Sequence, residues 1–262
     1  MTKFTLTNIL WTSISLMLLT ILALGYQPAW ILLVITLISY SLIVFGGVIN
    51  VNWQFFMPVI CRLPNDRNEI FLTFDDGPHQ NTTEILNLLE KYSAKGNFFC
   101  TGKQLEKFPL LAQKLFQMGH FIGNHSYSHT PYFPLRSVKK IKEELQNTSI
   151  LIEKYTKSKF RYFRPPYGVI NPTIAKGVKA VNMISIGWSI RSFDTQDREG
   201  NKALNKIKRK LKSGDIILLH DHSPKILWIL EELLRFIKDN NFNTQRIDTY
   251  FEQNSTYASK LH

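Results

Sequence analysis

The pattern of hydrophobic and polar positions changes abruptly after the first fifty residues of this 262-residue chain. Leu6 to Gly25 and Trp30 to Ile49 are almost purely apolar, and neither segment contains a charged side chain. Each is about as long as an α-helix that crosses roughly 30 Å of hydrocarbon. The two segments therefore predict two membrane-spanning helices.

A very short connector, YQPAW, joins these segments, and Pro28 interrupts the helix there. Such a hairpin returns the chain to its starting side, so the N-terminus and the rest of the chain are expected in one compartment. A cleaved signal peptide followed by one anchor is an alternative, although the first segment is long for a signal peptide and lacks an A-x-A-like site. Buried core helices are a third interpretation.

From Glu69 onward, short apolar runs alternate with segments in which apolar residues recur every three or four positions. The runs predict strands at 69–74, 96–100, 120–124, 161–164, 182–188 and 215–220, with a weaker candidate at 244–250. The other segments predict helices at 82–94, 108–118, 137–155, 171–180, 201–212 and 225–239. This alternation is typical of βα units around a parallel sheet, either open or closed into a barrel. We expect residues 1–50 to form the hairpin, 51–68 a connector, 69–250 one domain and 251–262 a tail.

The net charge of +12 lies almost entirely after position 50, because residues 1–50 contain one Lys and no acidic residue. Basic residues gather in predicted helices such as KKIKEELQ and KIKRKLK, which we interpret as solvated helix faces. No nucleic-acid-binding motif accompanies them, so we expect no nucleic-acid partner. Cys61 and Cys100 form no CxxC pair, and a disulfide between them is not favoured.

Residues that can carry chemistry lie at the ends of the predicted strands, where the loops of βα proteins gather on one face. They are Asp75 and Asp76 after the first strand, His125 and His129 after the third, Arg164 after the fourth, Asp194 after the fifth, and His220 with Asp221 at the end of the sixth. The pattern predicts an active site on that face.

His125 and His129, in HSYSH, are four residues apart, and on a helical turn this spacing puts both rings on one side, as two ligands of one metal require. A carboxylate from another strand end would complete a His2Asp zinc site with open positions for water and substrate. We expect His79, His120 and His222 to be packing, surface or neighbouring residues rather than ligands.

Four motifs, TFDDGP, HSYSH, RPPYG and ILLHD, occur in this order between Glu69 and Tyr250. Together they resemble the polysaccharide deacetylase (NodB-homology) family of carbohydrate esterases. The resemblance implies a distorted (β/α)7–8 barrel, preceded here by the transmembrane hairpin. It also implies a divalent metal, Zn2+ or another transition metal such as Co2+, and the removal of N-acetyl or O-acetyl groups from polysaccharides.

The resemblance assigns roles to the residues that match its motifs. Asp75 would be the general base, paired with Arg164. Asp76 would bind the metal together with His125 and His129. A bound metal lowers the pKa of water to about 7 in favourable sites, which supplies a nucleophile for acetamide hydrolysis.

The remaining motif residues would act on the other reacting atoms. The backbone N–H of Tyr167 would help to bind the oxyanion, and His220 would be the general acid, tuned by Asp194. An imidazole suits this task because its intrinsic pKa is near 6.5. The residues expected to contact the substrate are Pro165, Pro166, Trp188 and Leu219.

One stretch, WSIRSFDT, departs from the family pattern of Trp, then Asp, then a second Asp followed by Trp. Trp188 and Asp194 fit this pattern, but Arg191 replaces the first Asp and Thr195 replaces the second Trp. The departure leaves the substrate open among chitin-like, peptidoglycan and other acetylated glycans.

These observations predict a multi-pass, membrane-anchored deacetylase of an N-acetylated saccharide, with its catalytic domain facing outward because the family usually acts on exported glycans. The alternatives are an O-acetyl esterase, a catalytically silent glycan-binding module and a metal-independent glycosidase with two carboxylates. The retained base, metal residues and acid argue against a silent module, because binding alone needs no base and acid pair.

Overall fold

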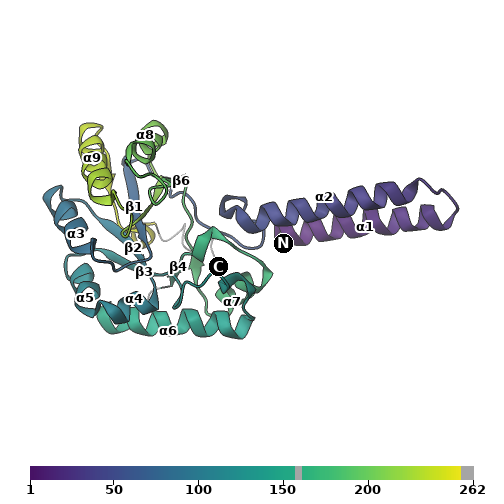
Figure 1. Ribbon diagram of the computed structural model, residues 1–262, viewed down its shortest axis with the longest axis horizontal. Coiled ribbons are helices and arrows are strands. Elements are labelled where there is room, and N and C mark those ends of the chain that lie inside the picture. Colours follow the sequence, from purple (N-terminus) through teal and green to yellow (C-terminus); the bar gives the residue numbers. More distant parts are fainter. Residues whose placement is uncertain (157–160, 255–262) are drawn as a thin grey trace.

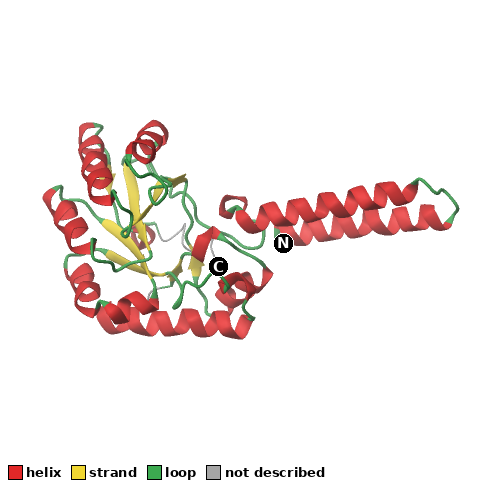
Figure 2. Cartoon of the chain, viewed as in Figure 1, coloured by secondary structure: helices red, strands yellow, loops and turns green. Residues whose placement is uncertain are grey.

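The computed structural model describes residues 1–156 and 161–254. A helical hairpin projects from an α/β body in which helices surround a curled sheet (Figure 1). Figure 2 shows the strands gathered inside the body, with the helices on its outside. This partly open barrel of parallel strands confirms the predicted fold class.

The hairpin consists of α1 (Lys3–Ala23) and α2 (Ala29–Ile49), each of 21 residues. Both helices are long and apolar enough to cross a membrane, with mean hydropathies of 1.8 and 2.5, and only 6% of each span is buried. Two hydrogen bonds link them, from Trp11 Nε1 to Ser39 Oγ at 3.1 Å and from Tyr40 Oη to Asn8 Oδ1 at 2.9 Å. Polar pairs of this kind hold apolar helices together where lipid surrounds them.

The sheet has the strand order β5-β4-β3-β2-β1-β7-β6, with β8 pairing β1, and every pairing of its strands is parallel. β1 is buried along its whole length, as expected for a strand covered on both faces. The strands are β1 (Glu69–Asp75), β2 (Gly96–Cys100), β3 (Phe121–Asn124), β4 (Tyr162–Phe163), β5 (Ile184–Ser185), β6 (Ile190–Arg191), β7 (Ile216–His220) and β8 (Asn243–Thr244).

Six of the helices outside the hairpin lie where the periodicity predicts them. They are α3 (Thr82–Lys91), α5 (Pro109–Gln117), α6 (Val138–Thr156), α7 (Pro172–Ala180), α8 (Asn201–Lys210) and α9 (Ile226–Asp239). Two more helices, α4 (Gly102–Lys107) and α10 (Ile247–Gln253), and the short strand β6 were not predicted.

The weaker strand predicted at 244–250 is wrong. Only Asn243–Thr244 pairs as a strand, and the following residues form α10. Ile247, Tyr250 and Phe251 are buried, and their spacing of three and four residues is that of one helix face. That segment is too short for alternation and helical periodicity to be told apart from sequence.

Residues 51–63 are part of the core rather than a free connector. Val51, Phe55, Phe56, Val59, Ile60 and Leu63 are buried in a cluster with residues of β1, β2 and β7. The backbone of Ile60 also donates to Ser185 O at 2.9 Å and accepts from Gly187 N–H at 2.8 Å. The body therefore begins before Glu69 and continues through α10, while residues 255–262 of the predicted tail lie outside the described part.

The base of the hairpin is hydrogen-bonded to the body. Phe4 N–H donates to Phe55 O, and Ile170 N–H donates to Val48 O, both at 3.0 Å. At Gly47 a Cβ would lie 2.3 Å from the Phe55 ring, so only glycine permits this close approach. The hairpin is thus anchored to the loop that follows the RPPYG motif.

Strand β7 shows why the predicted substrate contact of Leu219 is wrong. Side chains alternate between the two faces of a strand, so Leu218 and His220 face the interior of the barrel while Leu219 faces the helices. Leu219 is fully buried in the core cluster formed with those helices. It contributes to packing and not to a binding surface.

Candidate active site

The sheet register brings the catalytic candidates together at the carboxyl ends of the strands. Asp75, the last residue of β1, is the register partner of His220, the last residue of β7. On the other side of β1, β2 and β3 end at Cys100 and Asn124, and His125 follows directly. Asp75, Asp76, His125, His129 and His220 all line one cavity of about 220 Å³.

Asp76, His125 and His129 form the one group among the described residues whose ligand atoms converge as a metal site would require. Their ligand atoms all lie within 4.8 Å of one another. His125 Nε2 and His129 Nε2 are 3.5 and 3.2 Å from Asp76 Oδ1. That oxygen is buried and has no hydrogen-bond partner in the described part of the chain.

The second nitrogen of His125 determines its tautomer. Nδ1 lies 2.8 Å from Arg164 O, and because a carbonyl only accepts, Nδ1 carries the proton. In the neutral form of His125, Nε2 then presents a lone pair toward the orphaned oxygen of Asp76. Three acceptor atoms facing one point fit a divalent cation, so these residues suit the metal that the sequence indicates.

The histidine turn is not helical, which corrects the helical-turn interpretation of HSYSH. Ser126 and His129 have φ values of 64° and 45°, in the left-handed region. The buried carboxylate of Glu144, in α6, holds this turn by accepting hydrogen bonds from Tyr127 N–H at 3.0 Å and Ser128 N–H at 2.8 Å. Glu144 also pairs with Arg136 at 2.5 Å.

Nearby charges and burial both shift the pKa values of Asp76, His125 and His129. Burial alone would raise the pKa of Asp76, but the interactions with His125, His129 and His220 bring it below the usual range. Burial disfavours charge on His125, yet Asp75 and Asp76 outweigh burial and raise its pKa. Burial, together with the neighbouring His125, lowers the pKa of His129 to about 4, so His129 is a neutral imidazole at pH 7.

Arg164 is completely buried and every arm of its guanidinium has a partner. Nη1 donates to Asp75 Oδ1 at 2.8 Å and to Thr73 Oγ1 at 2.6 Å. Nη2 donates to Gly187 O at 2.8 Å, Nε donates to Ile186 O at 3.3 Å, and Cζ lies 4.1 Å from the Phe99 ring centre. These contacts fix the carboxylate of Asp75 with one oxygen held by the arginine.

His220 is paired with Asp194, which comes from the loop after the unpredicted strand β6. His220 Nδ1 lies 3.0 Å from Asp194 Oδ1, and Asp194 Oδ2 accepts from His220 N–H at 2.9 Å. Burial opposes the charged imidazole, but the Asp194 contact prevails and raises the pKa of His220 to about 8. Burial likewise opposes charge on Asp194, whose pKa is nevertheless lowered, chiefly by His220.

The RPPYG loop contributes a wall of the cavity through only part of its sequence. Tyr167, with φ of 61°, and Gly168 line the cavity with Trp188, whereas Pro165 and Pro166 are buried and do not line it. Of these residues expected to contact the substrate, Trp188 therefore lines the cavity, whereas the two prolines do not. Tyr167 Oη donates to His129 O at 3.1 Å, which ties this loop to the histidine turn.

Arg191 and Thr195, the two departures from the family pattern, line the cavity. The lining residues that the sequence analysis did not assign to the site are Gly168, Phe193, Gln196, Leu218 and His222. His222 Nδ1 lies 3.6 Å from Asp76 Oδ2, two residues beyond His220. The only indication in the sequence that His222 lies at the site is its position directly after the His–Asp pair of ILLHD. His120 is a buried packing residue, as expected, and its Nδ1 accepts from Gly96 N–H at 3.1 Å.

Comparison with known proteins places this chain in a family. The model of the polysaccharide deacetylase family matches residues 62–185. A peptidoglycan-N-acetylglucosamine deacetylase from Bacillus cereus is 34% identical over 167 residues, which cover 62% of this chain and 77% of the relative. The chain therefore belongs to the polysaccharide deacetylase family of hydrolases.

Two solved structures show the same fold. A peptidoglycan N-acetylglucosamine deacetylase superposes with a TM-score of 0.69 at 26% identity, covering 74% of this chain and 92% of that one. A pseudoenzyme of the same carbohydrate esterase family from Bacillus anthracis superposes with a TM-score of 0.67 at 26% identity, covering 74% of this chain and 68% of that one. The family thus includes an inactive member, so the residues of the site carry the argument for activity.

Replacing Arg164 by Met should leave the buried Asp75 carboxylate without its partner. Losing one member of a buried ion pair costs about 3–5 kcal/mol in the free energy of unfolding. Urea denaturation of the full chain in detergent measures the loss. The double variant with Arg164→Met and Asp75→Asn should recover part of it, and Arg209→Gln on exposed α8 should stay within about 0.5 kcal/mol. An Arg164→Met variant as stable as the wild type would contradict the buried pair.

Proposed function

We propose that this protein is a metal-dependent deacetylase that removes acetyl groups from an N-acetylated saccharide of the chitin or peptidoglycan type. One observation carries the proposal: Asp75 and His220 end neighbouring strands and line the same cavity as Asp76, His125 and His129. A binding module needs neither an arginine-held carboxylate nor an aspartate-tuned imidazole. The family membership and the deacetylase relatives support the same reaction.

Asp76, His125 and His129 would hold the divalent metal, and Zn2+ or Co2+ suits two imidazoles and a carboxylate. When bound, such an ion polarises water and the acetyl oxygen. The fit rests on the orphaned Asp76 Oδ1 and on the His125 tautomer that turns Nε2 toward it.

The residues of the chain would supply the proton transfers. Asp75, oriented by Arg164, takes a proton from the attacking water as its oxygen bonds to the acetyl carbon. The backbone N–H of Tyr167 donates to the oxygen that gains charge. His220, protonated through its contact with Asp194, gives a proton to the nitrogen as the C–N bond breaks, which releases acetate and a free amine.

The hairpin supports a location at the membrane. We propose that α1 and α2 span the cell membrane and that the body, from about residue 51, faces outward, where acetylated glycans are exported. The hydropathy of both helices and their low burial support spanning, and their antiparallel arrangement puts the N-terminus beside the body. Residues 69–250 hold the family motifs, and 51–68 and α10 complete that unit.

Acetate release and metal content test the proposed reaction together. The metal-loaded full chain should release acetate from N-acetylglucosamine oligomers or a cell-wall fraction, and a chelator should abolish the release. Asp76→Ala should lose metal, whereas Asp75→Asn should keep it and lose at least about 100-fold in turnover, because only the base is removed. Elemental analysis and an acetate assay measure the two effects.

The possible outcomes separate the alternatives. Activity that survives chelation would favour a glycosidase, and release from acetate esters alone would favour an O-acetyl esterase. Metal binding without release from any substrate would favour a silent module. Equal metal loss in both aspartate variants would overturn the division of roles between them.

The His220–Asp194 contact predicts a pH dependence. The acid must be protonated, so activity should fall as pH rises through the pKa of His220, raised to about 8 in this protein. Asp194→Asn removes the charge that opposes burial, so the alkaline limb should move down by about one pH unit or more. The pH profile of kcat/KM measures this shift in the same metal-loaded form. Asp239→Asn, an exposed change on α9, should leave the profile in place, and an unmoved limb in Asp194→Asn would show that His220 is not the titrating acid.

Membrane topology is testable with single cysteines introduced at exposed positions of the body. A membrane-impermeant thiol reagent added to intact cells should label Arg209→Cys if the body faces outward. Labelling only after the cells are permeabilised would place the body inside. Recovery of the protein in the soluble fraction would contradict a spanning hairpin.

A further inference from the structure

Arg191, the residue that replaces the usual family Asp, lies exposed at the wall of the active-site cavity. Its guanidinium Cζ is 5.9 Å from the Trp188 ring centre and 4.8 Å from the Phe193 ring centre. Stacking uses the flat faces of a guanidinium and leaves its N–H edge available for a planar oxyanion. Among residues 1–156 and 161–254, no carboxylate forms an ion pair with it.

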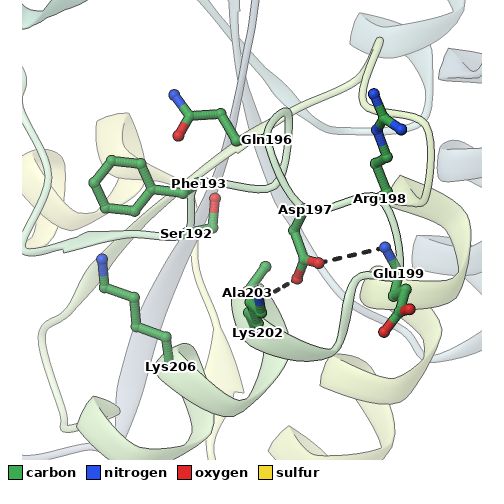
Figure 3. Close-up of a pocket in the computed structure, with 9 residues that line it drawn as sticks. All are labelled: Ser192, Phe193, Gln196, Asp197, Arg198, Glu199, Lys202, Ala203 and Lys206. Carbon is green, nitrogen blue, oxygen red and sulfur yellow. Dashed lines mark hydrogen bonds between the residues drawn. The ribbon is translucent and has the colours of Figure 1, made fainter.

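A second cation, Lys206 of α8, approaches the same aromatic ring. Its Nζ lies 3.9 Å from the Phe193 ring centre, and Figure 3 shows the two side chains directed toward each other. Partial burial, followed by the charges of Lys210, Arg191 and Arg209, lowers the pKa of Lys206. No acidic side chain of the described residues pairs with this amine either. Neither cation therefore has an ion-pair partner among the described residues.

The two cations line adjacent cavities, Arg191 the active-site cavity and Lys206 its neighbour. The active-site cavity shares Phe193 and Gln196 with a neighbouring cavity of about 530 Å³ that Lys206 also lines. Two acidic residues, Asp197 and Glu199, line that neighbouring cavity. The carboxylate of Asp197 accepts from Ala203 N–H at 2.8 Å and from Glu199 N–H at 3.3 Å, as Figure 3 shows. Its charge is thus directed to the start of α8.

The loop that carries Phe193 presents the ring to the cavity. Phe193 has φ of 62°, a left-handed conformation that is uncommon for an aromatic residue, and its side chain is exposed. Its neighbours Ser192 and Asp194 are buried and hydrogen-bonded, which holds the ring outward. Backbone strain of this kind persists where the surrounding structure maintains it, often at ligand sites.

We propose that Arg191 and Lys206, positioned on the rings of Trp188 and Phe193, bind an anionic group of the substrate. The substrate is then an acetamido sugar that carries a phosphate or a carboxylate close to the acetylated unit. A neutral glycan would leave both cations unpaired, whereas an oxyanion gains charge-assisted hydrogen bonds from them. The identity of this substrate class rests on the proposed function, but the binding of the anion does not.

Calorimetric binding to the metal-loaded full chain in detergent tests the subsite, with acetate release measured in parallel. The probes are N-acetylglucosamine 1-phosphate, N-acetylmuramic acid and the neutral methyl N-acetylglucosaminide. The wild type should bind at least one anionic probe roughly tenfold or more tightly than the neutral one. Comparison of the phosphate and carboxylate probes identifies which anion the site takes.

The variants test whether the two cations cause the preference. Arg191→Gln and Lys206→Gln should each reduce the ratio of anionic to neutral affinity by about fivefold or more. Lys208→Gln is the matched control, because Lys208 is also a lysine of α8 and also lies over an aromatic ring, Phe236 at 5.4 Å, but it lines neither cavity. It should retain the wild-type ratio.

Three results would overturn the subsite. The first two are equal affinity of the wild type for all three probes and a ratio that Arg191→Gln leaves unchanged. The third is a ratio that falls equally in Lys208→Gln, because net charge would then be the cause. An Arg191-dependent preference without acetate release would support the subsite and refute the proposed deacetylation. Acetate release without any preference would do the reverse.

Discussion

The buried guanidinium of Arg164 is the constraint on which the rest of the site depends. A charge removed from water is costly unless it is fully paired, and here β1, β2 and the segment after β5 each supply a partner. The same residue, through its carbonyl, fixes the tautomer of His125. One side chain and its own backbone thus orient both the candidate base and one candidate metal ligand.

Around this centre, the parallel sheet gathers loops whose backbones are unusual. Asp76, Ser126, His129, Tyr167 and Phe193 all have positive φ, and all lie at the carboxyl edge of the sheet. The buried carboxylate of Glu144 holds the histidine turn with hydrogen bonds to two backbone N–H groups, and that of Asp194 binds the backbone N–H of His220 at the end of β7. The rigid core therefore supports strained loops where ligands would bind, which is how such strain is maintained in proteins.

The hairpin is structurally continuous with this site. The Val48–Ile170 hydrogen bond anchors α2 to the chain three residues after Tyr167, whose hydroxyl in turn contacts the histidine turn. The aromatic cluster of Phe4, Phe55 and Phe56 fills the junction, with Phe4 and Phe56 centroids 4.9 Å apart. In a membrane-spanning hairpin, this junction would set the distance of the cavity from the bilayer surface.

The sequence by itself determined the two apolar helices, the βα alternation and the order of the residues at the strand ends, because these depend on local periodicity and on short motifs. The contacts between Asp75 and Arg164, 89 positions apart, and between Asp194 and His220 were expected only through family resemblance. Local patterns did not reveal α10 or β6, since segments of two to seven residues carry too few positions to define a period. Only the tertiary structure placed Leu219 in the core and brought both Arg191 and Lys206 to the ring of Phe193, because the facing of a strand and the approach of distant segments depend on how the whole sheet curls.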